Sequence, residues 1–280
     1  RRCVTASRDD LLDRMRTVLT GFEKGPSEEE IDPLDQLASW TEAMREDWEA
    51  NVMDEYGNID DSPYRHGYWS FAYSLDSKFD QPSLSEFLDL LREVKGHETG
   101  WPAWLISEDQ VHPRDETIEG WYTGGTFDDP AHADYWRASP DGMLFLLRGY
   151  QEDSKDELEP GTVLDYILPI WRVGECLLHA KRLGRELGEE NTSVTLQARW
   201  TGLEGRTLGS IENRRGLFPP VERESHQATV TASQRFTVQD FEDALPEVVE
   251  TLTQPLYQIF DFYEPPSDLI QNELDRMQSQ

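Results

Sequence analysis

Residues 134–153, DYWRASPDGMLFLLRGYQED, predict a β-hairpin at the centre of the fold. In its turn, residues 139–142 (SPDG), Pro fits the second position of a type I turn and Gly tolerates a left-handed conformation. The return arm, residues 143–147, is almost wholly apolar, which is typical of a strand buried on both faces. Polar side chains flank that arm: Arg137, Arg148, Glu152 and Asp153.

Outward from the hairpin, the chain predicts helices and strands in mixed order. Strand patterns cover residues 64–75, 117–122, 193–200 and 227–236. One helix is predicted directly after a capping box that begins at Ser7. Further helical patterns cover residues 34–48, 84–91, 163–187, 240–262 and 267–277. Pro169 is expected to kink its helix or delay its start, and Pro255 permits a break. The fold class is therefore α+β: a mixed, largely antiparallel sheet with hairpins, packed against several long helices.

A boundary is predicted near residue 97. Residues 1–97 form an N-terminal helical segment with one strand, and residues 98–280 form an α+β domain, although the two can also make one unit. Residues 1–6 read as the end of a strand that belongs to a missing upstream domain. The chain does not begin with Met, which suggests a fragment or a processed product.

The charge balance is strongly acidic, with 56 Asp and Glu against 26 Lys and Arg and a formal net charge of −30. Adaptation to high salt explains such a composition, because short screening lengths tolerate a carboxylate-rich surface. A basic partner or bound cations are the alternative. Since no stripe of Lys and Arg offers phosphates a footprint, no direct binding of nucleic acid is predicted.

The sequence lacks the marks of a secreted or membrane protein. Only Cys3 and Cys176 occur, so neither a disulfide framework nor a Cys-x-x-Cys metal motif is present. No apolar run approaches the length of a membrane span, and the first residues do not resemble a signal peptide. A cytoplasmic location without membrane contact is predicted.

Six polar residues form the candidate ligand-binding site: Arg137, Arg148, Glu152, Glu175, His179 and Arg199. Arg side chains suit carboxylates and phosphates, although pairing with the protein's own acids is favoured here. Glu175 and His179 are four residues apart and could share a metal ion or a proton, but a third ligand and an HExxH motif are absent. A structural pair is therefore favoured. No catalytic residue, metal or cofactor is assigned.

Six tryptophans either line an aromatic pocket or belong to the core, and core is the favoured interpretation. They are Trp101, Trp104, Trp121, Trp136, Trp171 and Trp200.

Several short blocks occur in a defined order along the chain. They are residues 68–70 (YWS), 100–102 (GWP), 135–142 (YWRASPDG), 147–153 (LRGYQED), 171–175 (WRVGE), 199–203 (RWTGL), 255–257 (PLY) and 260–262 (FDF). The set resembles the region downstream of Schlafen-like AlbA domains in prokaryotic multidomain proteins. Residues 1–7 are similar to the tail of the AlbA-like domain itself, where Gly is more usual than Cys3. The resemblance implies an upstream nucleotide- or DNA-binding domain, and it carries over no functional residues.

The predicted function is a non-catalytic sensing or protein-interaction domain of a transcriptional regulator or ATP-binding protein of halophilic type. A protein partner or self-association is expected. The alternative is a small-molecule-binding or hydrolytic enzyme domain with its site around Arg137, Arg148, Glu175 and His179, and a second alternative is an oligomerisation scaffold. Convergence of those side chains in an aromatic-lined pocket would favour ligand binding, whereas local pairing would favour an interaction domain.

Overall fold

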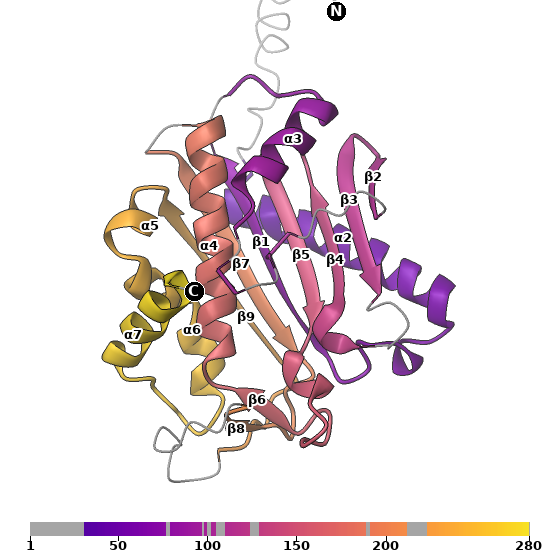
Figure 1. Cartoon of the computed structure of the whole chain (residues 1–280), viewed down its shortest axis with the longest axis vertical. Helices are drawn as coiled ribbons and strands as arrows, with labels where there is room; N and C mark the ends of the chain where they lie inside the picture. The colour runs from indigo at the N-terminus through magenta and orange to yellow at the C-terminus, as the bar shows by residue number, and fades with distance from the viewer. Residues whose placement is uncertain are drawn as a thin grey trace, which may run out of the picture. The chain divides into compact units, whose positions relative to one another are not determined.

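A seven-stranded antiparallel sheet forms the centre of the computed structural model, with strand order β2-β3-β4-β5-β1-β7-β9 (Figure 1). In that order the strands are Val111–Arg114, Thr117–Thr123, Ala133–Ala138, Met143–Gly149, Tyr68–Asp76, Ser193–Thr201 and Thr229–Thr237. Strands β6 (Val163–Asp165) and β8 (Thr207–Gly209) form a separate parallel pair. The structure describes residues 31–76, 79–96, 98–99, 102–104, 110–123, 129–188, 191–211 and 223–279.

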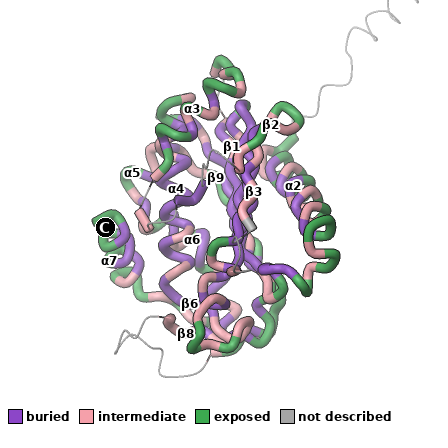
Figure 2. Tube along the Cα trace, turned by 45° about the vertical axis from the view of Figure 1, so that its right-hand side comes forward, coloured by how far each residue is buried: buried purple, intermediate pink, exposed green. Residues whose placement is uncertain are grey.

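Helices cover both faces of the sheet. Helix α2 (Pro33–Tyr56) lies on one face, and the other helices lie on the opposite face (Figures 1 and 2). These are α3 (Leu84–Val94), α4 (Leu168–Leu187), α5 (Asp240–Asp243), α6 (Leu245–Gln258) and α7 (Ser267–Gln278). Short 3-10 turns occur at Ile59–Asp61, Pro130–His132 and Gln151–Ser154. The predicted α+β class with a largely antiparallel sheet is confirmed.

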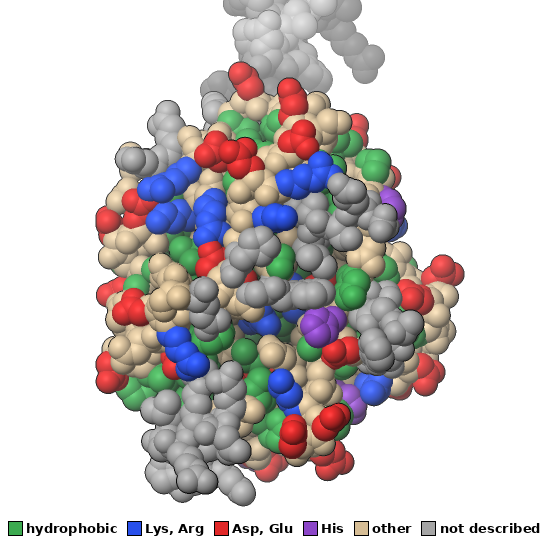
Figure 3. All heavy atoms as spheres, in the orientation of Figure 1, with side chains coloured by type: hydrophobic (Ala, Val, Ile, Leu, Met, Phe, Trp, Pro, Cys, Tyr) green, Lys and Arg blue, Asp and Glu red, His purple; other side chains and the backbone are tan. Residues whose placement is uncertain are grey.

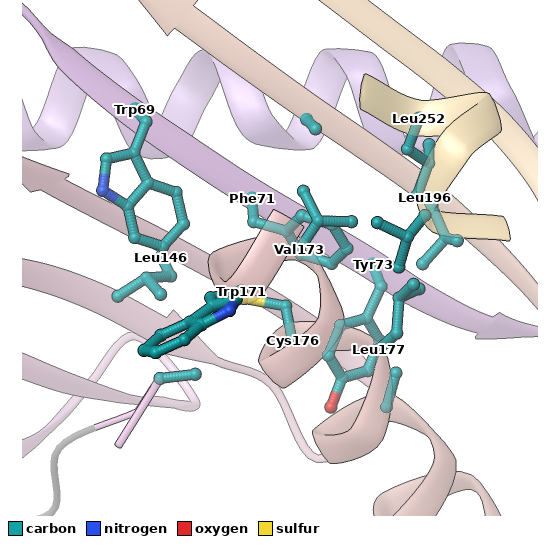
Figure 4. Close-up of a cluster of buried hydrophobic side chains, with 14 of the residues drawn as sticks. Trp69, Phe71, Tyr73, Leu146, Trp171, Val173, Cys176, Leu177, Leu196 and Leu252 are labelled. Atoms are coloured by element: carbon teal, nitrogen blue, oxygen red, sulfur yellow. The ribbon is translucent and has the colours of Figure 1, made fainter. Parts of the chain in front are cut away.

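Each face of the sheet has its own hydrophobic core. Along β1, Tyr68 and Ala72 pack toward α2, while Trp69, Phe71 and Tyr73 pack toward α4, as the period of two requires. Figure 2 shows the central strands buried along their length, and Figure 4 shows the larger core. In that close-up, side chains of β1 lie beside Val173, Cys176 and Leu177 of α4. Burial on both faces explains the unbroken apolar run of β5.

The predicted hairpin is formed by β4 and β5. Ser139 N donates to Met143 O at 2.8 Å and Gly142 N donates to Ser139 O at 2.9 Å, which closes the turn. Gly142 has a φ of +92°, a conformation that side-chain-bearing residues rarely adopt. The register places Asp134 directly opposite Arg148, so the hairpin itself sets an acid beside a base.

Two predicted helices begin or divide differently in the structure. Helix α4 begins at Leu168 because residues 163–165 form β6, and the carboxylate of Asp165 accepts from the amides of Ile167 and Leu168 at 2.7 and 3.0 Å. Pro169 then occupies the first turn, where a missing N–H costs nothing. The helix expected over residues 240–262 is divided at Ala244 into α5 and α6, whereas Pro255 lies inside α6 without ending it.

Strand β1, which precedes the boundary expected at residue 97, lies in the middle of a sheet built mostly from later strands. Residues 33–280 accordingly form one compact unit. The helix expected after Ser7 and the strand end expected at residues 1–6 lie outside the described residues. Within the described part of the chain, no helix combines the length and the apolar character that crossing a membrane requires.

Replacing Phe262 with Gly is expected to raise the free energy of unfolding by about 1 kcal/mol. Asp261 and Phe262 follow α6 with φ values of +52° and +56°, and the Phe262 side chain is 89% exposed, so it gains little from packing. Asp tolerates the left-handed region better than Phe, so Asp261→Gly should give a smaller gain. Urea unfolding of both variants tests this, and a loss of stability in Phe262→Gly would contradict it.

Candidate functional site

A buried arginine stands at the end of β5 beside the N-terminal half of α4. Arg148 is 1% exposed and forms an ion pair with Asp134, which is also 1% exposed. Its Nη2 donates to the carbonyl oxygens of Pro102 and Ala103 at 2.9 and 3.2 Å, and the guanidinium lies 5.7 Å from the ring centre of Trp69. Its Nη1 is buried and has no hydrogen-bond partner among the described residues. A buried N–H without an acceptor costs about 1–3 kcal/mol, so this atom is a place where a ligand would add stability.

A second arginine, Arg172, comes from the first turns of α4. Its Nη1 donates to Thr99 Oγ1 at 3.0 Å, and its Nη2 donates to Gln151 Oε1 at 3.1 Å. Glu175, one helical turn later, approaches the same guanidinium at 3.5 Å and accepts from Thr99 Oγ1 at 3.0 Å. Burial, followed by repulsion from Arg148, lowers the pKa of Arg172, while burial raises the pKa of Glu175. The positive charges of Arg148 and Arg172 therefore repel each other within this buried site.

Two neighbouring cavities open at these arginines. The narrow cavity has a volume of about 20 Å³, room for one or two water-sized groups. Its polar and aromatic wall consists of Trp69, Arg148, Tyr150, Gln151, Glu152, Arg172 and Trp200. The wide cavity has a volume of about 390 Å³ and includes Asp165, Trp171, Ser210 and Arg276. Gln151, Leu168 and Arg172 line both, so Arg172 stands in the wall between them.

Glu152 contributes a titratable carboxyl to the narrow cavity. It is 3% exposed, and its Oε1 accepts from the backbone N–H of Asp165 at 2.8 Å. Burial, with a smaller contribution from the charge of Asp165, raises the pKa of Glu152 to about 7. The carboxyl therefore changes charge near neutral pH, in a cavity wall that also includes Arg148 and Arg172.

The structure brings three of the six predicted site residues together. Arg148 and Glu152 line the narrow cavity, and Glu175 joins them through Arg172 and Thr99. His179, although on α4, is buried in the core, where it contacts Tyr73 Oη at 2.9 Å and lies 4.3 Å from the ring of Trp104. Burial lowers the pKa of His179 to about 3, which keeps the ring neutral.

Arg137 and Arg199 do not face the cavities. Arg137 is on the α2 side of the sheet, where it pairs with Asp47 at 2.9 Å and Glu119 at 3.3 Å. Arg199 alternates with Ala198 and Trp200, which face the α4 core, so it also lies on the α2 side. Across the described ranges, no three His, Cys, Asp or Glu side chains are placed to hold a metal ion.

Four of the predicted tryptophans belong to the larger hydrophobic core: Trp104, Trp136, Trp171 and Trp200. Of these, Trp200 also lines the narrow cavity and Trp171 the wide one. Trp121 donates to Glu55 at 3.1 Å, and Trp101 lies outside the described residues.

Sequence reasoning missed Arg172, Trp69 and Thr99 as site residues. The spacing of Arg172 and Glu175 on one helix face was a usable signal, because residues three apart are neighbours in a helix. Trp69 and Thr99 gave no such signal, since strand order alone brings Trp69 beside Arg148.

The most conspicuous basic side chains on the surface belong elsewhere. Figure 3 shows Lys and Arg gathered over the upper part of α4, away from its N-terminus. There Lys181 and Arg185 pair with Glu242, and Arg182 pairs with Glu98. Each of these three cations is therefore already paired with a carboxylate of the chain.

No protein-family model, curated protein or solved structure matches the chain.

Proposed function

We propose that the chain is a non-catalytic sensing domain that binds a small anion at the two cavities. The narrow cavity takes one or two oxygen atoms of a carboxylate or phosphate group, and the wide cavity takes the rest of the ligand. The observation that carries the proposal is the buried Arg148 Nη1, which has no acceptor among the described residues and belongs to a side chain lining the narrow cavity.

The chemistry of the walls supports an anion rather than a cation or a neutral ligand. Arg148 and Arg172 both reach the narrow cavity, and guanidinium groups bind carboxylates and phosphates through paired hydrogen bonds. Desolvation strengthens such bonds, because water that would compete for the anion is excluded. Trp69 and Trp200 supply apolar walls, and the volume limits the bound group to a few atoms.

The residues best suited to catalysis lie outside both cavities, which favours sensing over an enzyme. Cys176 is buried in the core, and burial raises the pKa of its thiol well above the ordinary value. His179 is held neutral in the same core. A thiol that stays protonated is a poor nucleophile, and a histidine with so low a pKa is a poor base near neutral pH.

The test is a thermal-shift and calorimetry panel of acetate, succinate, phosphate and phosphorylated metabolites, with chloride at matched ionic strength as the reference. At least one anion is expected to raise the unfolding midpoint. Arg172→Gln should weaken that binding about tenfold or more, because a hydrogen bond to a charged group contributes about 1.5–3 kcal/mol.

Arg182→Gln is the matched control, since Arg182 lies on the same helix but pairs with Glu98 outside the cavities. It should bind the anion as the unmodified chain does. No stabilisation by any anion, or full binding by Arg172→Gln, would contradict the proposal.

We further propose that this sensing serves a cytoplasmic regulator whose nucleotide- or DNA-binding domain lies upstream, as the sequence resemblance implies. The location of the site at the N-terminus of α4 suits this role, since a ligand there would stabilise contacts among α4, β5 and the 3-10 turn at Gln151–Ser154. Adaptation to high salt stays a prediction from composition.

A further inference from the structure

The two edges of the sheet differ in their capacity to pair with another strand (Figure 1). Edge strand β2 spans only Val111–Arg114 and contains Pro113, which cannot donate a backbone hydrogen bond. Edge strand β9 spans Thr229–Thr237, has nine residues and contains no proline. Short strands and prolines are the usual protection of a sheet edge, and β9 has neither.

The outward hydrogen-bonding groups of β9 can be identified from its pairing with β7. Val238 N donates to Thr192 O at 3.0 Å, which continues the β7–β9 register by one pair. Antiparallel strands bond at every second residue, so the even-numbered residues of β9 bond to β7. The odd-numbered residues direct their N–H and C=O groups outward: Thr229, Thr231, Ser233 and Arg235. Among the described residues, no other backbone group bonds to these four.

The edge is also accessible and free of acids. Ser233, Gln234 and Arg235 are three consecutive exposed residues, so this part of β9 is open to solvent. The sequence of β9, TVTASQRFT, contains no Asp or Glu, although the chain has 56 of them in 280 residues. The one charge, on Arg235, is paired with Asp76 at 2.9 Å.

We propose that a second copy of this chain pairs antiparallel with β9 and forms a twofold dimer through a continuous sheet. Two chains that each carry a net charge of −30 repel, which favours contact where unpaired carboxylates are few. Strand β9 contributes no carboxylate, and the Asp76 carboxylate beside it is paired with Arg235. A register centred on Ser233 pairs Ser233 with its counterpart and sets Arg235 opposite Thr231 of the other copy, so it uses three of the four outward residues. Because β2 is blocked, head-to-tail pairing cannot propagate and the assembly closes at two.

Sedimentation velocity over a roughly hundredfold range of protein concentration tests the proposal, because mass action makes a weak dimer concentration-dependent. A species of twice the 32.4 kDa chain mass is expected to grow with concentration. It should grow further with added salt, since salt screens the repulsion and leaves backbone hydrogen bonds intact. A dimer that weakens with salt would indicate an ion-paired interface and would overturn the assignment to β9.

Ser233→Pro removes an outward N–H, together with the hydroxyl that accepts from Gln197 at 3.4 Å, and should give a monomer, whereas Ser233→Thr keeps both groups and should dimerise. If the proline variant does not fold, the exposed double variant Thr231→Asp with Ser233→Asp should be folded and monomeric. Hydrogen exchange of the outward amides should slow as concentration rises. A dimer that survives these variants would overturn the proposal. A chain that stays monomeric at every concentration would also overturn it. If the outward amides of that monomer were protected from hydrogen exchange, another segment of the chain would be covering the edge.

Discussion

Replacing Arg206 with Met is expected to lower the free energy of unfolding by about 3–5 kcal/mol. Arg206 is fully buried, and its guanidinium pairs with both oxygens of Asp153 at 2.9 and 2.7 Å. It also donates to three backbone carbonyls, those of Gly202, Val163 and His66, at 2.7–2.8 Å. The side chain lies 4.4 Å from the ring centre of Tyr150. One residue therefore joins four segments of the chain, and its loss leaves a buried carboxylate without its counter-charge.

Arg137→Met is the matched control for this prediction. Arg137 is 2% exposed, but the side chain of its partner Asp47 is 38% exposed and can be solvated by water. Its second partner, Glu119, keeps an ion pair with Arg114 at 3.1 Å, so neither acid is left buried without a counter-charge. The loss of stability should be clearly smaller than in Arg206→Met. Urea unfolding of both variants provides the comparison. Equal losses, or a loss below about 1 kcal/mol for Arg206→Met, would show that the Arg206 network contributes less than its geometry implies.

Local patterns in the sequence predicted most elements of the fold, but not the short strands β6 and β8. The SPDG turn and the apolar run after it predicted β4 and β5, and alternation at residues 193–200 predicted β7. The Ser83 capping box is present at the start of α3, where Ser83 and Glu86 bond reciprocally. Such signals depend only on residues close in sequence, so they can be recognised without knowledge of the tertiary structure.

The site could be predicted only in part, because strand order and sheet face decide which side chains meet. Arg148 and Glu152 are close in sequence and stayed together in the structure. Arg137 belongs to the same hairpin, but a side chain's face alternates along a strand, so it points to the α2 side. The start of α4 at Leu168 also depends on a tertiary event, the pairing of residues 163–165 with β8.

Replacing Glu152 with Gln is expected to stabilise the chain at pH 8 and to leave it nearly unchanged at low pH. The folded-state pKa of Glu152 is about 7, above the ordinary value of 4.5, because burial disfavours the ionised form. For a carboxyl with a raised pKa, the stability present below pH 4.5 is lost as the pH rises through 7. The full shift corresponds to about 3 kcal/mol. The amide introduced by Glu152→Gln would keep an oxygen for the Asp165 N–H without acquiring the charge.

Urea unfolding at pH 5.5 and pH 8 measures the free energy of unfolding of Glu152→Gln and of the unmodified chain. The difference between the two free energies is expected to be larger at pH 8. Glu157→Gln, which removes one exposed charge from the same loop, is the control.

The proposed anion site adds a second readout, the affinity for the anion. Ionised Glu152 lines the narrow cavity and repels an anion bound there, so anion affinity should fall between pH 6 and pH 8 in the unmodified chain and change much less in Glu152→Gln. A constant stability difference across this range would place the pKa of Glu152 near its ordinary value and remove the basis for a pH-sensitive site.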